Sequence, residues 1–177
     1  MEHELIDKIP VAVTCDPAEL CAAAGFDDRD RELLVFAETC VKELASSLEA
    51  WRIADPGSEG GRDGFLLLAI TAETGETLER IFAQSPSRGY LAQTLAARLL
   101  TRAATTLVPE IAAHGCAPLV APPLPVREAL ASLGVNWIEP GSISRAWALL
   151  TPMPYRGGCE VCLLAVDCPH LRGGGRP

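Results

Sequence analysis

A continuous apolar run at residues 65–72 (FLLLAITA) constrains the fold of this chain more than any other feature. The run is short and turn-forming residues bound it, which is typical of a strand buried on both faces of its sheet. The chain has 177 residues, 49% of them apolar, and this is enough material for one hydrophobic core. We therefore expect a single domain in which helices pack with a small sheet.

The part of the chain before this strand predicts two helices and a short strand at residues 11–14. Asp16 and Pro17 provide an N-cap and a first-turn proline for a helix that ends near Gly25. A loop with four glycines, residues 55–64, ends this region, so residues 1–60 form an N-terminal helical extension. The second helix carries an apolar stripe with helical spacing: Leu33, Phe36, Ala37, Cys40, Val41, Leu44, Leu48 and Trp51.

The part of the chain after the strand continues with helices. Thr74 is expected to cap a helix that stops at residues 85–87 (SPS). Residues 90–107 form the clearest helix, because leucine or alanine recurs every four residues along one side. A short amphipathic helix is expected at residues 126–133, after a proline-rich link.

Residues 135–151 are expected to form two short strands around Pro140 and Gly141, a pairing typical of a hairpin-like turn. Residues 61–158 are thus interpreted as an α+β core with a small mixed or antiparallel sheet packed with several helices. Residues 159–177 form a separate cysteine-rich tail.

Composition excludes several classes of partner. The formal net charge is −8, which argues against sequence-independent binding to a phosphate backbone, so no nucleic acid is expected. Apolar runs are far shorter than the ~20 residues needed to cross a bilayer, and no basic, apolar leader opens the chain. We therefore expect no membrane partner and a cytoplasmic location.

The common signatures of enzyme sites are absent from the sequence. No GxGxxG, P-loop, GxSxG or HExxH pattern occurs. His3 and His114 have no carboxylate or nucleophile at motif spacing, so we expect no catalytic dyad.

Seven cysteines in a chain expected in a reducing compartment point to metal binding or burial rather than to disulfides. Cys159, Cys162 and Cys168 fall close together in the pattern C-x2-C-x5-C-P-H. Thiolates two residues apart can bind one ion, because a tight turn points both sulfurs to the same side. His170 is then the expected fourth ligand of a tetrahedral Cys3His zinc site.

An iron–sulfur cluster fits the same three cysteines equally well. Its fourth ligand would come from elsewhere, with Cys116 as one choice, or the position would stay open to a small molecule. Unliganded thiols are the remaining alternative. Cys40 differs from these residues, because its place on the apolar helical stripe predicts a buried thiol that packs as a small hydrophobe.

The order of segments from residue 66 to residue 170 resembles the reactivation domain of cobalamin-dependent methionine synthase and its free-standing relatives. The resemblance runs from the apolar strand and TGETLERIF (residues 74–82) through the long helix opened by Gly89 and Tyr90. It continues through LGVNWIEPGSISRAWALLTPMPYRGG (residues 133–158) to the terminal C-x2-C-x5-C-P.

The resemblance implies an unusual α+β fold and an accessory role in methionine biosynthesis. Members bind S-adenosylmethionine beside the cobalamin of the synthase, and reductive methylation rescues cofactor that has reached the inactive cob(II)alamin state. The loop at residues 151–158 would lie near the corrinoid, with these residues as its cofactor-binding set: Pro152, Tyr155, Arg156, Gly157 and Gly158. The stretch from Cys116 to Pro125 lacks the family's arginine and Gly-Tyr pair, which argues against binding of the methyl donor.

Two functions are therefore expected. The first is an accessory protein that assists reductive reactivation of a cobalamin-dependent methionine synthase or another corrinoid protein. The alternative is a small iron–sulfur or zinc-binding redox or interaction protein without methyl-donor binding.

Overall fold

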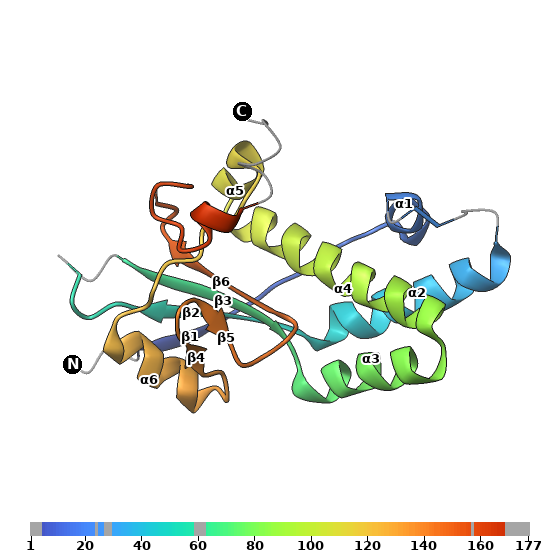
Figure 1. Cartoon of the computed structure of the whole chain (residues 1–177), viewed down its shortest axis with the longest axis horizontal. Coiled ribbons are helices and arrows are strands. Elements are labelled where there is room, and N and C mark those ends of the chain that lie inside the picture. Colours follow the sequence, from blue (N-terminus) through green and yellow to red (C-terminus); the bar gives the residue numbers. More distant parts are fainter. Residues whose placement is uncertain (1–4, 24, 27–29, 59–62, 157, 169–177) are drawn as a thin grey trace.

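A four-stranded antiparallel sheet with the order β1-β2-β3-β6 organises the chain (Figure 1). The computed structural model describes residues 5–23, 25–26, 30–58, 63–156 and 158–168. The strands of this sheet are β1 (Ile6–Ile9), β2 (Leu48–Ala54), β3 (Gly64–Ile70) and β6 (Ala148–Met153). A second, two-stranded sheet pairs β4 (Trp137–Ile138) with β5 (Ser142–Ile143).

Helices account for most of the remaining described chain. They are α1 (Pro17–Ala23), α2 (Arg31–Ser47), α3 (Ala72–Gln84), α4 (Pro86–Leu107), α5 (Glu110–His114) and α6 (Leu124–Ser132), with a single 3-10 turn, η2 (Ala165–Asp167). The molecule is thus one α+β arrangement with an antiparallel sheet, as the sequence predicts.

The central strand, β3, is buried at all seven positions, which confirms the prediction for this apolar run. Alternate side chains enter two separate cores because successive strand residues point to opposite faces. Leu66, Leu68 and Ile70 join one hydrophobic cluster, while Phe65 and Leu67 join the other. Other elements of the chain therefore have to pack on both faces of the strand, and they do so.

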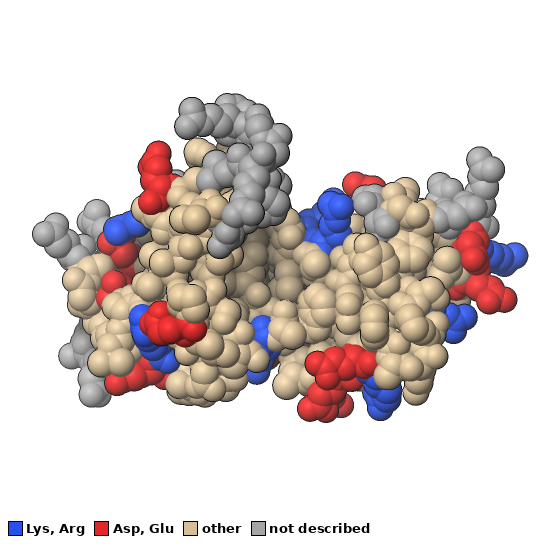
Figure 2. Space-filling model, viewed as in Figure 1, with Lys and Arg blue, Asp and Glu red and all other residues tan. Residues whose placement is uncertain are grey.

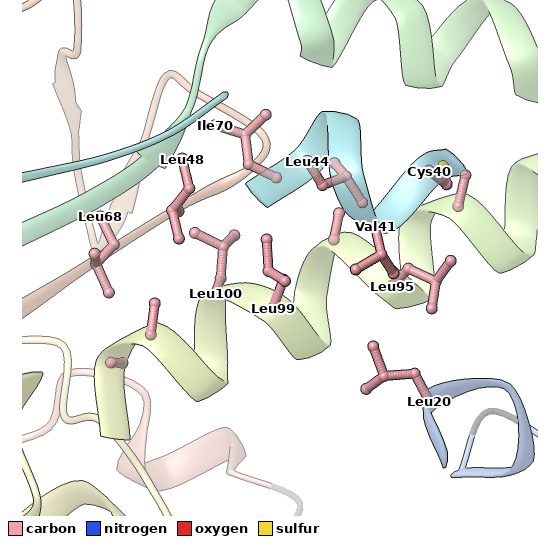
Figure 3. Close-up of a cluster of buried hydrophobic side chains, with 14 of the residues drawn as sticks. Leu20, Cys40, Val41, Leu44, Leu48, Leu68, Ile70, Leu95, Leu99 and Leu100 are labelled. Carbon is pink, nitrogen blue, oxygen red and sulfur yellow. The ribbon is translucent and has the colours of Figure 1, made fainter. Parts of the chain in front are cut away.

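Different helices cover the two faces of the sheet. Helix α4 fills the larger core, where its leucines meet α2 and the sheet (Figure 3). Residues Val126, Ala129 and Leu130 of α6 cover the other face, to which β6 contributes the buried side chain of Leu150. Helices α2 and α3 pack mainly against α4 rather than against the sheet.

The second predicted helix is too long in the sequence-based interpretation, which carried its stripe through Trp51. In the structure α2 ends at Ser47, and β2 begins at the next residue. Leu48 and Trp51 continue the helical spacing of the stripe in the sequence, although they do not belong to the helix. Their backbone instead pairs with β3, and this long-range pairing outweighs the local pattern. The described part of residues 1–60 consequently holds two helices and also two strands of the main sheet.

Other boundaries differ in smaller ways. The strand expected at residues 11–14 is not formed; the nearby strand is Ile6–Ile9, which pairs with β2. Val11 and Val13 instead pack against the larger core as partly buried side chains. The expected turn around Pro140 and Gly141 is confirmed by the pairing of β4 with β5.

Charged side chains of opposite sign lie next to one another at several places on the face seen in Figure 2. The described chain also forms the ion pairs Lys8–Glu49 and Arg127–Glu139, at 2.8 and 2.7 Å. Among the described residues, no helix combines the length and apolar character that a bilayer crossing requires.

Gly89 lets α3 and α4 approach closely, and this contact gives a first prediction. A Cβ at Gly89 would meet the backbone of Phe82 and lie 2.6 Å from Phe82 Cβ, whereas a Cβ at Gly75 would lie 3.7 Å from Trp147 Cδ1. We expect Gly89→Ala to lower the free energy of unfolding by about 1–3 kcal/mol through overpacking. Gly75→Ala, also within a helix, should raise it by about 0.5–1 kcal/mol. Urea unfolding measures the free energy of unfolding of both variants. Equal changes in the two variants would contradict the close contact at Gly89.

Candidate metal centre

The cysteine-rich tail is held against the loop that precedes α6. The Leu163 N–H donates to the Leu119 carbonyl oxygen at 2.9 Å. The Leu163 side chain also packs over Gly141, where a Cβ would lie 3.3 Å from Leu163 Cδ1. Residues 159–168 of the tail therefore lie beside the core, although the residues that anchor them are distant in sequence.

Local hydrogen bonds shape the described end of the tail. The Ala165 N–H donates to the Cys162 carbonyl oxygen at 3.1 Å, and the Cys168 N–H donates to the Ala165 carbonyl oxygen at 3.4 Å. These two bonds and the turn η2 give the chain a defined local path between the second and third cysteines of the motif.

Tyr155 connects the tail to Cys116. Its ring stacks on the His114 imidazole, with centroids 5.0 Å apart and an angle of 8° between the planes. Its hydroxyl lies 3.5 Å from the Cys116 carbonyl oxygen, at the outer limit of a hydrogen bond. A Cβ at Gly158 would lie 3.6 Å from the same hydroxyl, so the residue before Cys159 also lies beside the Tyr155 side chain.

Cys159, Cys162 and Cys168 act electrostatically on Cys116. Burial raises the pKa of Cys116, and the charges of Cys159, Cys162 and Cys168 raise it further. Burial likewise raises the pKa of Tyr155, with added effects from Cys116, Cys159 and Cys162. We call Cys116, Cys159, Cys162 and Cys168 the tail thiol cluster.

The three predicted tail cysteines thus lie within electrostatic range of Cys116, which the sequence offered as one choice of fourth ligand. Cys159 is exposed and the other three are partly buried, and each is a free thiol. His170, the fourth ligand expected for zinc, lies outside the described residues. In the described ranges, no three His, Cys, Asp or Glu side chains are arranged to hold a metal ion. The zinc and iron–sulfur alternatives both stay predictions.

The loop expected near a corrinoid adjoins the tail thiol cluster. Met153, Pro154 and Tyr155 line a pocket of about 390 Å³ together with Arg52 and residues 107–110. Tyr155 therefore faces both this pocket and the cluster. No sequence pattern marked residues 107–110 as part of a site, because they reach the loop only through the packing of α4 and α5.

The remaining residues of the predicted set have different surroundings. Pro152 is buried within β6, opposite Phe65 of β3. Arg156 forms an ion pair with Asp63. Gly158 has a φ of +107°, a conformation that favours glycine, and Gly157 lies outside the described residues.

Comparison of the chain with protein-family models, with curated proteins and with solved structures found no match.

The burial of the thiols predicts how fast each reacts in the metal-free chain. Cys21 and Cys40 are 1% and 4% exposed, and burial with the charge of Glu43 raises the pKa of Cys40 to about 11. Because the thiolate is the nucleophile, both should resist iodoacetamide at pH 8 until the chain unfolds. Exposed Cys159 should be labelled first. Mass spectrometry of timed digests measures the order, and early labelling of Cys40 would contradict the described core.

Proposed function

We propose that this protein is an accessory protein that assists reductive reactivation of a corrinoid protein such as a cobalamin-dependent methionine synthase. The order of segments shared with the reactivation domain supports this role. The observation that carries it is the position of Tyr155, which lines the pocket beside the loop expected to face the corrinoid and also contacts the segment of Cys116. A docking loop and a group of thiols therefore adjoin on one surface.

The pocket suits the rim of a corrinoid, which carries both methyl groups and amide side chains. Leu107, Val108, Met153 and Pro154 offer apolar contact, while the polar groups come from Arg52, Glu110 and Tyr155. Pockets of this kind combine a mostly apolar lining with a few polar groups that fix orientation. In this role the chain binds the partner and orients it, and the methyl transfer takes place on the partner's cobalamin.

In the proposed role the protein acts in one cellular compartment and does not catalyse a reaction on its own. We take the site of action to be the cytoplasm, where the thiols stay reduced. Cobalt in cob(II)alamin takes up one electron from a low-potential electron donor before it is methylated. The chain's own contribution is to bind the partner in a conformation in which the cobalamin is accessible to that donor.

Mixing the full chain with methionine synthase loaded with cob(II)alamin tests the proposal. We expect a complex on gel filtration and a changed visible spectrum of the cobalamin. Tyr155→Ala should weaken the complex by about tenfold or more, because buried aromatic side chains dominate binding surfaces. Tyr90→Ala is the matched control, since Tyr90 is an exposed tyrosine of α4 that does not line this pocket. Neither complex nor spectral change with the unaltered chain would overturn the proposal.

A second function rests on the tail thiol cluster alone. A small metal-binding redox or interaction protein needs the four cysteines but no corrinoid partner. It would bind iron or zinc and show no complex with the loaded synthase, which separates it from the accessory role.

A further inference from the structure

Another cavity, of about 270 Å³, lies where the connection from β5 to β6 meets the start of α3 (Figure 1). Residues from both segments line it, and none of them lines the pocket that contains Tyr155. Small-molecule sites begin at about 300 Å³, so the size of this cavity suits a small ligand. Such a ligand would bind apart from the surface used in the proposed function.

Arg145 lines this cavity and has no partner among the described residues. Arg127 and Arg145 are the partly buried arginines of the described chain. Arg127 donates to the Pro122 carbonyl oxygen at 2.7 Å and pairs with Glu139 at 2.7 Å, whereas Arg145 makes no hydrogen bond or ion pair there. A Cβ at Gly134, which also lines the cavity, would lie 3.8 Å from Arg145 Nη2. The guanidinium N–H donors are therefore available to a ligand in the cavity.

Two carboxylates line the same cavity. Glu76 and Glu79 are three residues apart on α3, so they share one side of the helix. Neither side chain forms a hydrogen bond or an ion pair within the part of the chain that the structure describes, and neither pairs with Arg145. Opposite charges that line one cavity without pairing suit a ligand that carries one negative and one positive group.

Backbone hydrogen bonds hold the segment that carries Arg145. The Ser144 N–H donates to the Asn136 carbonyl oxygen at 2.9 Å, and the Asn136 N–H donates to the Ser144 hydroxyl at 2.9 Å. On the other side of Arg145, the Trp147 carbonyl oxygen accepts from the Ile70 N–H at 2.9 Å. A site whose backbone is already fixed loses less conformational freedom when a ligand binds.

We propose that this cavity binds a free α-amino acid with an apolar side chain. The Arg145 guanidinium binds the carboxylate, because its planar fork matches two carboxylate oxygens. The carboxylates of Glu76 and Glu79 accept hydrogen bonds from the ammonium group. Trp147 provides an apolar wall for the side chain beside Gly75, where a Cβ would lie 3.7 Å from Trp147 Cδ1.

Calorimetric titration of the full chain with L-norleucine tests the proposal. We expect one molecule of norleucine to bind per chain. Hexanoate lacks the ammonium group of norleucine, and pentylamine lacks its carboxylate. Each should bind about tenfold more weakly or worse, because each loses one set of charge-assisted hydrogen bonds.

Substitutions test the same charges on the protein. Arg145→Gln should weaken norleucine binding about tenfold or more, and so should the double variant Glu76→Gln, Glu79→Gln. Arg31→Gln and Glu73→Gln are the matched controls and should bind as the unaltered chain does, because both residues are exposed and lie outside the cavity lining. Arg145→Gln should also keep the urea midpoint, since its guanidinium has no described partner to lose.

Three results would overturn the proposal: no heat of binding at about 10 mM norleucine, equal affinity in Arg145→Gln and the unaltered chain, or equal affinity for norleucine and hexanoate. If Arg145→Gln does not fold, the comparison of the three ligands on the unaltered chain decides. The titrations contain no corrinoid. Their failure would leave the proposed function standing, and failure of the complex with the loaded synthase would leave this site standing.

Discussion

Burial of β3 on both faces is the constraint on which the rest of the structure depends. An apolar strand loses its stabilisation if either face meets water, so the sheet has to be covered twice. Helix α4 covers one face and α6 the other, and the two hydrophobic clusters are separated only by the sheet itself. Because α4 and α6 flank the segment 108–123 in the chain, this double cover forces that segment to cross from one face to the other. The crossing carries Cys116 past the edge of the sheet.

The candidate site lies where this crossing segment meets β6. Strand β6 pairs with β3, and the buried hydroxyl of its Thr151 donates to the Pro118 carbonyl oxygen of the crossing segment. The chain leaves β6 at Met153 and passes through Tyr155 into the tail. The pocket loop and the tail thiol cluster are therefore neighbours for a topological reason.

Local chemistry predicted much of the fold and only part of the site. The buried strand, the long helix α4 and the turn between β4 and β5 all follow from patterns within a few residues, and the structure confirms them. The predicted end of α2 was wrong, because Leu48 and Trp51 have helical spacing although their backbones pair with β3. In the same way, C-x2-C-x5-C identifies three thiols by spacing, but the position of Cys116 depends on strand order. Tyr155 was predicted through resemblance, and its stacking on His114 had no sequence signal.

The tail differs from the rest of the described chain in what stabilises it. Both core clusters draw their buried residues from positions up to Leu150, and Met153 and Tyr155 only pack against the larger one from its margin. The described tail has instead a few backbone hydrogen bonds and exposed apolar side chains. Each such bond contributes about 0.5–1.5 kcal/mol, which is comparable with the entropy lost on ordering a single residue. The described tail is therefore held more weakly than the sheet and helices, which the two buried cores stabilise.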